Sequence, residues 1–214
     1  MVSVYPDLSE EGKRIILMGK TGTGKTFAGL NIARHYEGMF QIQVLATKED
    51  KTILSLANEG VPIVTTINEV ADYPFPQYPI VVYYPNGIEL SQPEILDAWC
   101  EWIYLRKNTI AVIDELTKTV KSTYAPPGFL DLYTRGRSNH VTVIAHSQRP
   151  RGVPPTVYDE AEYYLKFYLS DIKDRKRVTD FTHPDMVRQV DHKHGFHLYV
   201  PSQSDKVFYV PSIV

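Results

Sequence analysis

The sequence has little cysteine and no long apolar run. Cys100 is the single cysteine among 214 residues, so no internal disulfide can form, and a reducing cytoplasm is the expected compartment. No apolar run approaches the length that crosses a bilayer, and residues 1–10 lack the basic and apolar regions of a signal peptide. These absences exclude a disulfide-stabilised secreted domain and predict that the chain has no transmembrane segment.

Net charge is also small. The 23 Lys and Arg residues nearly balance the 25 Asp and Glu residues, which leaves a formal net charge of −2. Such a chain has no overall attraction for nucleic acid, so any contact of that kind needs a local basic patch. Hydrophobic residues make up 43% of the chain, which is ordinary for a soluble domain with a sizeable core.

One glycine-rich stretch carries the clearest chemical signal. Residues 19–26, Gly-Lys-Thr-Gly-Thr-Gly-Lys-Thr, match the phosphate-binding loop pattern G-x-x-x-x-G-K-[ST] at each fixed position. An apolar run at 14–18 precedes the loop and a helical apolar series follows it, so the local order is strand, turn, helix. Glycines and the N–H groups of a helix N-terminus can together surround a phosphate.

The residue types in this loop predict how ATP and Mg²⁺ bind. Lys25 can reach the β- and γ-phosphates, and the Thr26 hydroxyl can hold Mg²⁺. The predicted nucleotide-binding residues are Gly19, Thr21, Gly22, Thr23, Gly24, Lys25, Thr26 and Phe27.

An acidic pair follows the apolar run at 109–113. Asp114 and Glu115 end this run in the hhhhD pattern known as Walker B. A parallel strand delivers the residues after it to the carboxyl edge of the sheet, where a phosphate-binding loop also opens. Asp114 is predicted to join the Mg²⁺ shell and Glu115 to polarise a water for attack on the γ-phosphate. The adjacent acids favour hydrolysis over transfer to a second substrate.

A third apolar run, at 141–145, delivers further polar residues to the same edge. Gln148 is predicted to bond the attacking water or the γ-phosphate, whereas His146 is given no chemistry. Near the end of the chain a histidine-rich stretch lacks any cysteine, so a solvated turn is favoured there over a zinc site. Its basic residues are His192, Lys193, His194 and His197.

Strand-like and helix-like segments alternate along the whole sequence. We find no internal repeat and no domain break, so residues 1–214 are predicted to form one P-loop ATPase domain. The expected fold is α/β, with a mostly parallel central sheet flanked by helices. Residues 1–13 are expected to be a lead-in, and residues 195–211 a terminal β-hairpin.

These motifs, in this order and spacing, resemble the HerA/FtsK superfamily of DNA-pumping ATPases. The residues that carry the resemblance are 19–26, 113–115, 135–137 and 148–150. The small size is most similar to the genome-packaging ATPases of membrane-containing icosahedral viruses with double jelly-roll capsids. The resemblance implies a RecA-like core and a protein in the host cytoplasm or associated with the virion. It also makes a capsid or membrane protein a possible partner.

The resemblance further implies a homo-hexameric ring that threads double-stranded DNA and hydrolyses ATP at its subunit interfaces. In that family an arginine finger enters the neighbouring site. Arg135 and Arg137 occupy the matching stretch, with Arg137 slightly favoured, and Arg149 is a further candidate. A packaging motor must accept any sequence, so contacts to DNA should be to its phosphates. Lys118 and Lys121, in an expected loop at 116–127, are candidates for these contacts, although an ordinary surface loop fits equally well.

Two alternatives stay open at the level of sequence. A nucleotide kinase also opens with a phosphate-binding loop, and residues 174–177 could imitate its arginine-rich lid. Because acids alternate with these basic residues, a salt-bridged helix is the favoured interpretation. A related motor for filament assembly or conjugation would have the same core motifs.

Overall fold

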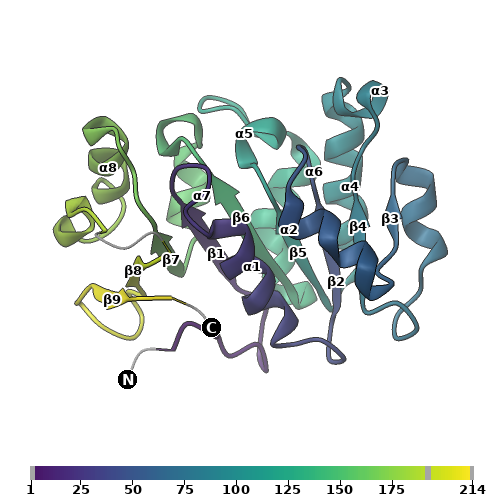
Figure 1. Cartoon of the computed structure of the whole chain (residues 1–214), viewed down its shortest axis with the longest axis horizontal. Helices are drawn as coiled ribbons and strands as arrows, with labels where there is room; N and C mark the ends of the chain where they lie inside the picture. The colour runs from purple at the N-terminus through teal and green to yellow at the C-terminus, as the bar shows by residue number, and fades with distance from the viewer. Residues whose placement is uncertain (1–2, 191–193, 213–214) are drawn as a thin grey trace.

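A mostly parallel β-sheet forms the centre of the molecule, and its main strands coincide with the apolar runs of the sequence (Figure 1). The structure is a computed structural model that describes residues 3–190 and 194–212. The strands are β1 (Arg14–Met18), β2 (Gln41–Leu45), β3 (Ile63–Val64), β4 (Ile80–Tyr83), β5 (Thr109–Ile113), β6 (Val141–Ser147), β7 (Tyr163–Lys166), β8 (Phe196–Tyr199) and β9 (Phe208–Val210). Every residue of β1, β2, β4, β5 and β6 is buried, which explains why these runs are mostly apolar. The buried polar exceptions are Arg14, Gln41, Gln43, Thr109, Thr142, His146 and Ser147.

The strands lie in the order β3-β4-β2-β5-β6-β1-β7-β8-β9. Neighbours from β3 to β7 are parallel, whereas β8 pairs antiparallel with both β7 and β9. Ile113 at the end of β5 lies opposite Leu45 of β2 and Ala145 of β6, and Met18 of β1 lies opposite Ser147. The segments after these four strands therefore leave the sheet at one edge. The predicted α/β P-loop fold with a C-terminal hairpin is confirmed.

Helices cover both faces of the sheet. The α-helices are α1 (Lys25–Arg34), α2 (Lys51–Leu54), α3 (Gly87–Leu90), α4 (Pro93–Arg106), α5 (Leu116–Thr119), α6 (Pro127–Leu130), α7 (Pro155–Asp159) and α8 (Ile172–Thr179). The 3₁₀ segments are η1 (Ser55–Glu59), η2 (Ile67–Asp72), η4 (Gly136–Asn139), η5 (Pro150–Gly152) and η6 (Pro184–Val187), and η3 (Asp131–Arg135) is a π-helical turn. Figure 1 shows α1 and α2 in front of the sheet and α4 behind it, and each side has its own apolar cluster.

The region after Walker B differs from the expected loop. Residues 116–119 form the one-turn helix α5, so Lys118 lies in a helix, and only Lys121 lies in the turn that follows. Glu115 is the N-cap, because its carboxylate accepts hydrogen bonds from the Thr117 hydroxyl at 2.9 Å and the Thr117 N–H at 3.4 Å. Within the described part of the chain, no helix is long and apolar enough to cross a membrane.

Arg14 anchors the amino edge of the sheet. Its side chain is fully buried, and its guanidinium donates to the carbonyl oxygens of Val141 at 2.7 Å, Leu132 at 2.9 Å, and also Tyr133. These bonds tie the start of β1 to η3 and to the start of β6. Burial lowers the pKa of Arg14 to about 10, so the group keeps its charge at neutral pH.

We predict that Arg14→Leu lowers the free energy of unfolding by about 3 kcal/mol or more, because buried carbonyl groups lose a charged donor. Urea denaturation monitored by circular dichroism measures the change. Arg188→Leu is the matched control, since that side chain is 72% exposed and pairs with Asp185 at the surface. Equal losses in the two variants would contradict the anchoring role of Arg14.

Candidate nucleotide site

The phosphate-binding loop joins β1 to α1. Gly22 and Gly24 have φ angles of 78° and 96°, left-handed conformations that glycine adopts without strain. A Cβ on Gly24 would lie 3.0 Å from Nδ1 of His194, so the loop also needs a small residue here. Because α1 begins at Lys25, the N–H groups of its first turn have no partner within the helix and are available to an anion.

Lys25 is held inside this loop. The residue is 5% exposed, and its Nζ donates to the carbonyl oxygen of Lys20 at 3.0 Å. Burial, and then the charge of Lys48, lower the pKa of Lys25 to about 8, although nearby carboxylates act in the opposite direction. The loop therefore holds an ammonium group whose charged form a bound phosphate would stabilise.

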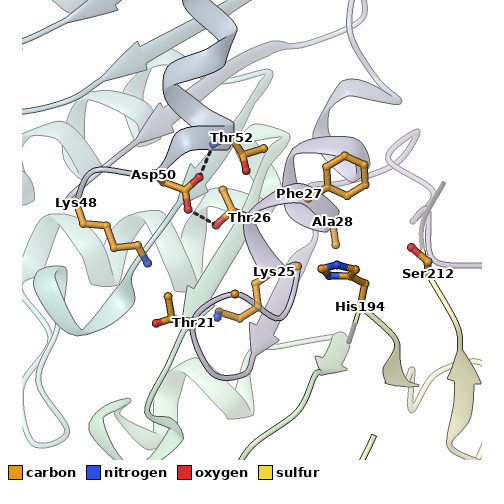
Figure 2. A pocket seen from close by; sticks show the side chains of 12 residues that line it. Thr21, Lys25, Thr26, Phe27, Ala28, Lys48, Asp50, Thr52, His194 and Ser212 are labelled. Atoms are coloured by element: carbon orange, nitrogen blue, oxygen red, sulfur yellow. Dashed lines mark hydrogen bonds between the residues drawn. The ribbon is translucent and has the colours of Figure 1, made fainter. Parts of the chain in front are cut away.

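Three oxygen ligands meet beside the loop. The Thr26 Oγ1 lies 3.1 Å from Asp114 Oδ1 and 3.2 Å from Asp50 Oδ2, and Figure 2 shows the bond to Asp50. The hydroxyl has one proton, so it can donate to only one of these carboxylates. Hard oxygen donors of this kind suit Mg²⁺, which keeps several waters and takes one or two carboxylates together with substrate phosphates. Among the described residues, no group of three or more His, Cys, Asp or Glu side chains is arranged to hold a metal ion.

Asp114 is fully buried among polar partners. Lys48 Nζ lies 3.3 Å from its Oδ2, and His146 Nδ1 lies 3.5 Å from its Oδ1. Burial acts to raise the pKa of Asp114, but His146, Lys48 and the Thr26 hydroxyl together hold it below its usual value. Asp114 is therefore an ionised carboxylate at neutral pH, as a metal ligand requires.

Glu115 and Gln148 reach the same edge of the sheet, as the sequence predicts. Glu115 is 6% exposed, and its Oε2 has no hydrogen-bond partner among the described residues, because only Oε1 caps α5. Gln148 Oε1 accepts a hydrogen bond from the Thr21 hydroxyl at 2.8 Å, so its side chain contacts the phosphate-binding loop. A buried carboxylate oxygen without a partner is suited to bind a water.

A cavity of about 420 Å³ lies over the loop, a size that fits a small-molecule ligand (Figure 2). Phe27 is 50% exposed, and in Figure 2 it lies on the same side as His194 and Ser212, which come from the C-terminal part of the chain. The lining residues are Thr21, Gly22, Gly24, Lys25, Thr26, Phe27, Ala28, Lys48, Asp50, Thr52, His194 and Ser212.

Sequence reasoning missed several of these residues. Lys48 and Asp50 follow β2, where no motif marks them, and their only signal is a charged segment after a buried strand. The expected solvated turn near the C-terminal end holds for His194, which is exposed in a turn and also lines the cavity, but it is wrong for His197, which is buried in β8. His192 and Lys193 lie outside the described residues.

Two of the three finger candidates, Arg135 and Arg137, lie before β6 at the amino edge of the sheet, whereas Arg149 follows β6. The Arg137 guanidinium donates to the Glu160 carbonyl at 2.5 Å and lies 3.4 Å from its carboxylate. Glu162 is a further partner at 3.9 Å. The side chain of Arg135 is 66% exposed and pairs with Asp131, one helical turn earlier. Arg135 is thus the freer of the two.

No protein-family model matches the sequence. DNA packaging ATPase P9 of Enterobacteria phage PRD1 is 28% identical over 188 residues, which cover 84% of this chain and 74% of the phage protein. The chain is a homologue of a viral DNA-packaging ATPase. The predicted resemblance to genome-packaging P-loop ATPases is confirmed.

Solved structures agree on the fold. B204, the DNA-packaging ATPase from Sulfolobus turreted icosahedral virus, superposes with a TM-score of 0.73 at 15% identity, covering 94% of this chain and 98% of B204. The genome-packaging NTPase B204 from Sulfolobus turreted icosahedral virus 2, in complex with AMPPCP, gives a TM-score of 0.71 at 15% identity with the same coverage. At this identity the two structures establish the P-loop fold.

We predict that Lys25→Met abolishes nucleotide binding yet stabilises the nucleotide-free protein. The pKa of Lys25 in the folded protein is about 8, below the usual 10.5. At pH 7 the buried charge of Lys25 therefore lowers the free energy of unfolding, and this destabilisation decreases as the pH rises from 8 to 10.5, because the folded protein releases the proton first. The melting temperature of the variant should exceed that of the wild type by several degrees at pH 7, and the gap should narrow by pH 9.5. Differential scanning calorimetry across this range checks the sign, and a gap that widens with pH would contradict it.

Proposed function

We propose that this chain is an ATP-hydrolysing motor that translocates double-stranded DNA and packages a viral genome into a preformed capsid. One observation carries the proposal. Thr26 and Asp114 meet at 3.1 Å beside a loop that Gln148 contacts at 2.8 Å. These contacts support a single site with a phosphate loop, a candidate metal-binding pair and a candidate sensor, in a homologue of a packaging ATPase.

The residues support hydrolysis as follows. The α1 N-terminus and Lys25 bind the β- and γ-phosphates, and Gln148 orients the terminal phosphate or the attacking water. Glu115 accepts a proton from this water while the water oxygen forms a bond to the γ-phosphorus. The bond between the γ-phosphorus and the oxygen that bridges it to the β-phosphate then breaks, which releases ADP. Mg²⁺, held by Thr26 and Asp114, would neutralise charge on the phosphate oxygens.

The remaining charge of the transition state calls for a cation from outside the subunit. We assign this role to an arginine finger in a homo-hexameric ring. Arg135 suits the role better than Arg137, because the Arg137 guanidinium is already bound by Glu160 and Glu162. The weak surface pair of Arg135 with Asp131 leaves it able to exchange partners.

The DNA-binding surface is proposed at the same edge of the sheet as the nucleotide. Lys118 in α5 and Lys121 in the next turn are both exposed, and Glu115 is the N-cap of the helix that carries Lys118. Their charges would bind DNA phosphates without reading sequence. A motor of this kind would work in the host cytoplasm or on the virion, docked to a capsid or membrane protein.

The kinase alternative has less support. In this segment Arg175 donates to the carbonyl oxygens of Leu169 at 2.9 Å and Ser170 at 3.2 Å, and Asp174 pairs with Arg151 at 3.0 Å. Arg177 stacks over Phe181 with 4.5 Å to the ring centroid. These contacts make the cluster a structural support of α8 instead of a mobile lid.

We predict that long double-stranded DNA stimulates phosphate release from ATP. Glu115→Gln should bind ATP yet hydrolyse it at least ~100-fold more slowly, since a general base contributes about 10²–10⁴-fold. A phosphate-release assay with parallel nucleotide titration measures both quantities, and Glu101→Gln on exposed α4 surface is the control. Phosphorylation of a nucleoside monophosphate, with no response to DNA, would favour a kinase.

We also predict that inactive subunits rescue one another. Mixed rings of Glu115→Gln and Arg135→Ala subunits contain interfaces in which both the base and the finger are intact, so part of the ATPase activity should return. The assay is run at several mixing ratios, with the solution mass measured alongside. If Glu115→Gln rings regain activity with Arg137→Ala subunits but not with Arg135→Ala subunits, Arg137 is the finger. If no mixture regains activity although the rings are intact, no arginine finger acts in trans.

A further inference from the structure

Lys48 occupies a position that neither the phosphate-binding loop nor Walker B accounts for. It follows β2, whose Leu45 lies opposite Ile113 of β5, so the register brings Lys48 beside Asp114. Its side chain is 30% exposed and lines the cavity over the loop. Figure 2 shows its amine directed toward the loop that carries Thr21 and Lys25.

Two ammonium groups therefore face one cavity from different elements. Lys25 comes from the start of α1 and Lys48 from the segment after β2, and both line the cavity over the loop. Like charges in a half-enclosed site repel strongly unless an anion lies between them. Single carboxylates are poor matches for two cations, whereas the triphosphate of a nucleotide carries enough negative charge for both.

The nearby acids leave Lys48 one carboxylate partner, Asp114, in the nucleotide-free protein. Asp50 uses Oδ1 to cap α2 through the N–H groups of Thr52 and Ile53, and its Oδ2 lies against Thr26. Glu115 uses Oε1 to cap α5. When Asp114 turns its oxygens to the Mg²⁺ shell, Lys48 loses this partner, and the end of a phosphate chain in the same cavity would offer it a new one. Glu115 Oε2, which also has no partner among the described residues, is the proposed site of the attacking water.

We propose that Lys48 is a second phosphate-binding lysine that reads the terminal phosphate, exchanging Asp114 for the γ-phosphate when ATP binds with Mg²⁺. The inference rests on the proposed nucleotide site and deepens it. The γ-phosphate of ATP gives the Lys48 ammonium group a new partner. ADP has no γ-phosphate, so with ADP the ammonium group stays paired with Asp114 or is solvated. Lys48 therefore sets the preference of the site for ATP over ADP, and hence the state that a subunit holds after hydrolysis.

The test measures binding instead of turnover. Fluorescent ATPγS and ADP are titrated with Mg²⁺ into the wild type and into Lys48→Met, and the ratio of the two dissociation constants is compared. We expect ATPγS to bind ~10-fold or more weakly in the variant, as for the loss of one charged hydrogen bond, while ADP changes less than about 3-fold. Lys48→Gln, which keeps a donor but no charge, should show the same fall, and Lys48→Arg should retain most of the ratio.

Lys51→Met is the matched control, because Lys51 is exposed on α2 and does not line the cavity. An unchanged ratio in both Lys48→Met and Lys48→Gln would overturn the inference. Tighter binding of both nucleotides would also overturn it, since Lys48 would then only compete with Mg²⁺ for Asp114. If the wild type bound neither nucleotide, the proposed function itself would fail, which separates the two conclusions.

Discussion

The common direction of β1, β2, β5 and β6 is the constraint on which the candidate site depends. Each of these strands is parallel to its neighbours in the sheet, so the segments that follow them emerge along one edge. Residues that lie far apart in sequence, such as Thr21 and Gln148, then bond directly. The Thr26 hydroxyl completes this arrangement, because it links α1 to the end of β5 and to the cap of α2.

This edge concentrates buried charge, which the fold must support elsewhere. Lys25, Asp114 and Glu115 are all less than 9% exposed, and desolvation of such groups costs free energy. Two apolar clusters, one on each face of the sheet, supply the stabilisation that offsets this cost. At the opposite edge Arg14 satisfies backbone carbonyls and joins β1 to β6. The carboxyl edge of the sheet therefore holds the buried charges of the candidate site, and the amino edge is stabilised by the hydrogen bonds of Arg14.

Short-range patterns predicted much of this structure from the sequence. Buried parallel strands read as continuous apolar runs, and the glycine loop and acidic pair have fixed spacings, so the sheet core and the Walker residues were foreseeable. Lys48 and Asp50 were not, because their roles depend on β2 lying beside β5, a pairing that no local pattern encodes. His194 was missed for the same reason, since its contact with Gly24 joins distant parts of the chain.

The contacts of individual side chains could not be predicted from the sequence either. The sequence alone does not distinguish the surroundings of Arg135 and Arg137. In the structure Glu160 and Glu162, which lie more than 20 residues further along the chain, pair with Arg137 and not with Arg135. Glu115 was read purely as a base, whereas one of its oxygens begins α5. Because Glu115 is the N-cap of α5, the orientation of its carboxylate depends on the short helix that carries Lys118.

The contact between His194 and the glycine loop has a consequence for how the protein is made. The segment that includes both Walker motifs leaves the ribosome well before residue 194, and domains gain structure as synthesis proceeds. During that interval the phosphate-binding loop lacks one wall of its cavity. A nascent chain would therefore carry both Walker motifs before the part of the cavity wall that His194 forms is in place.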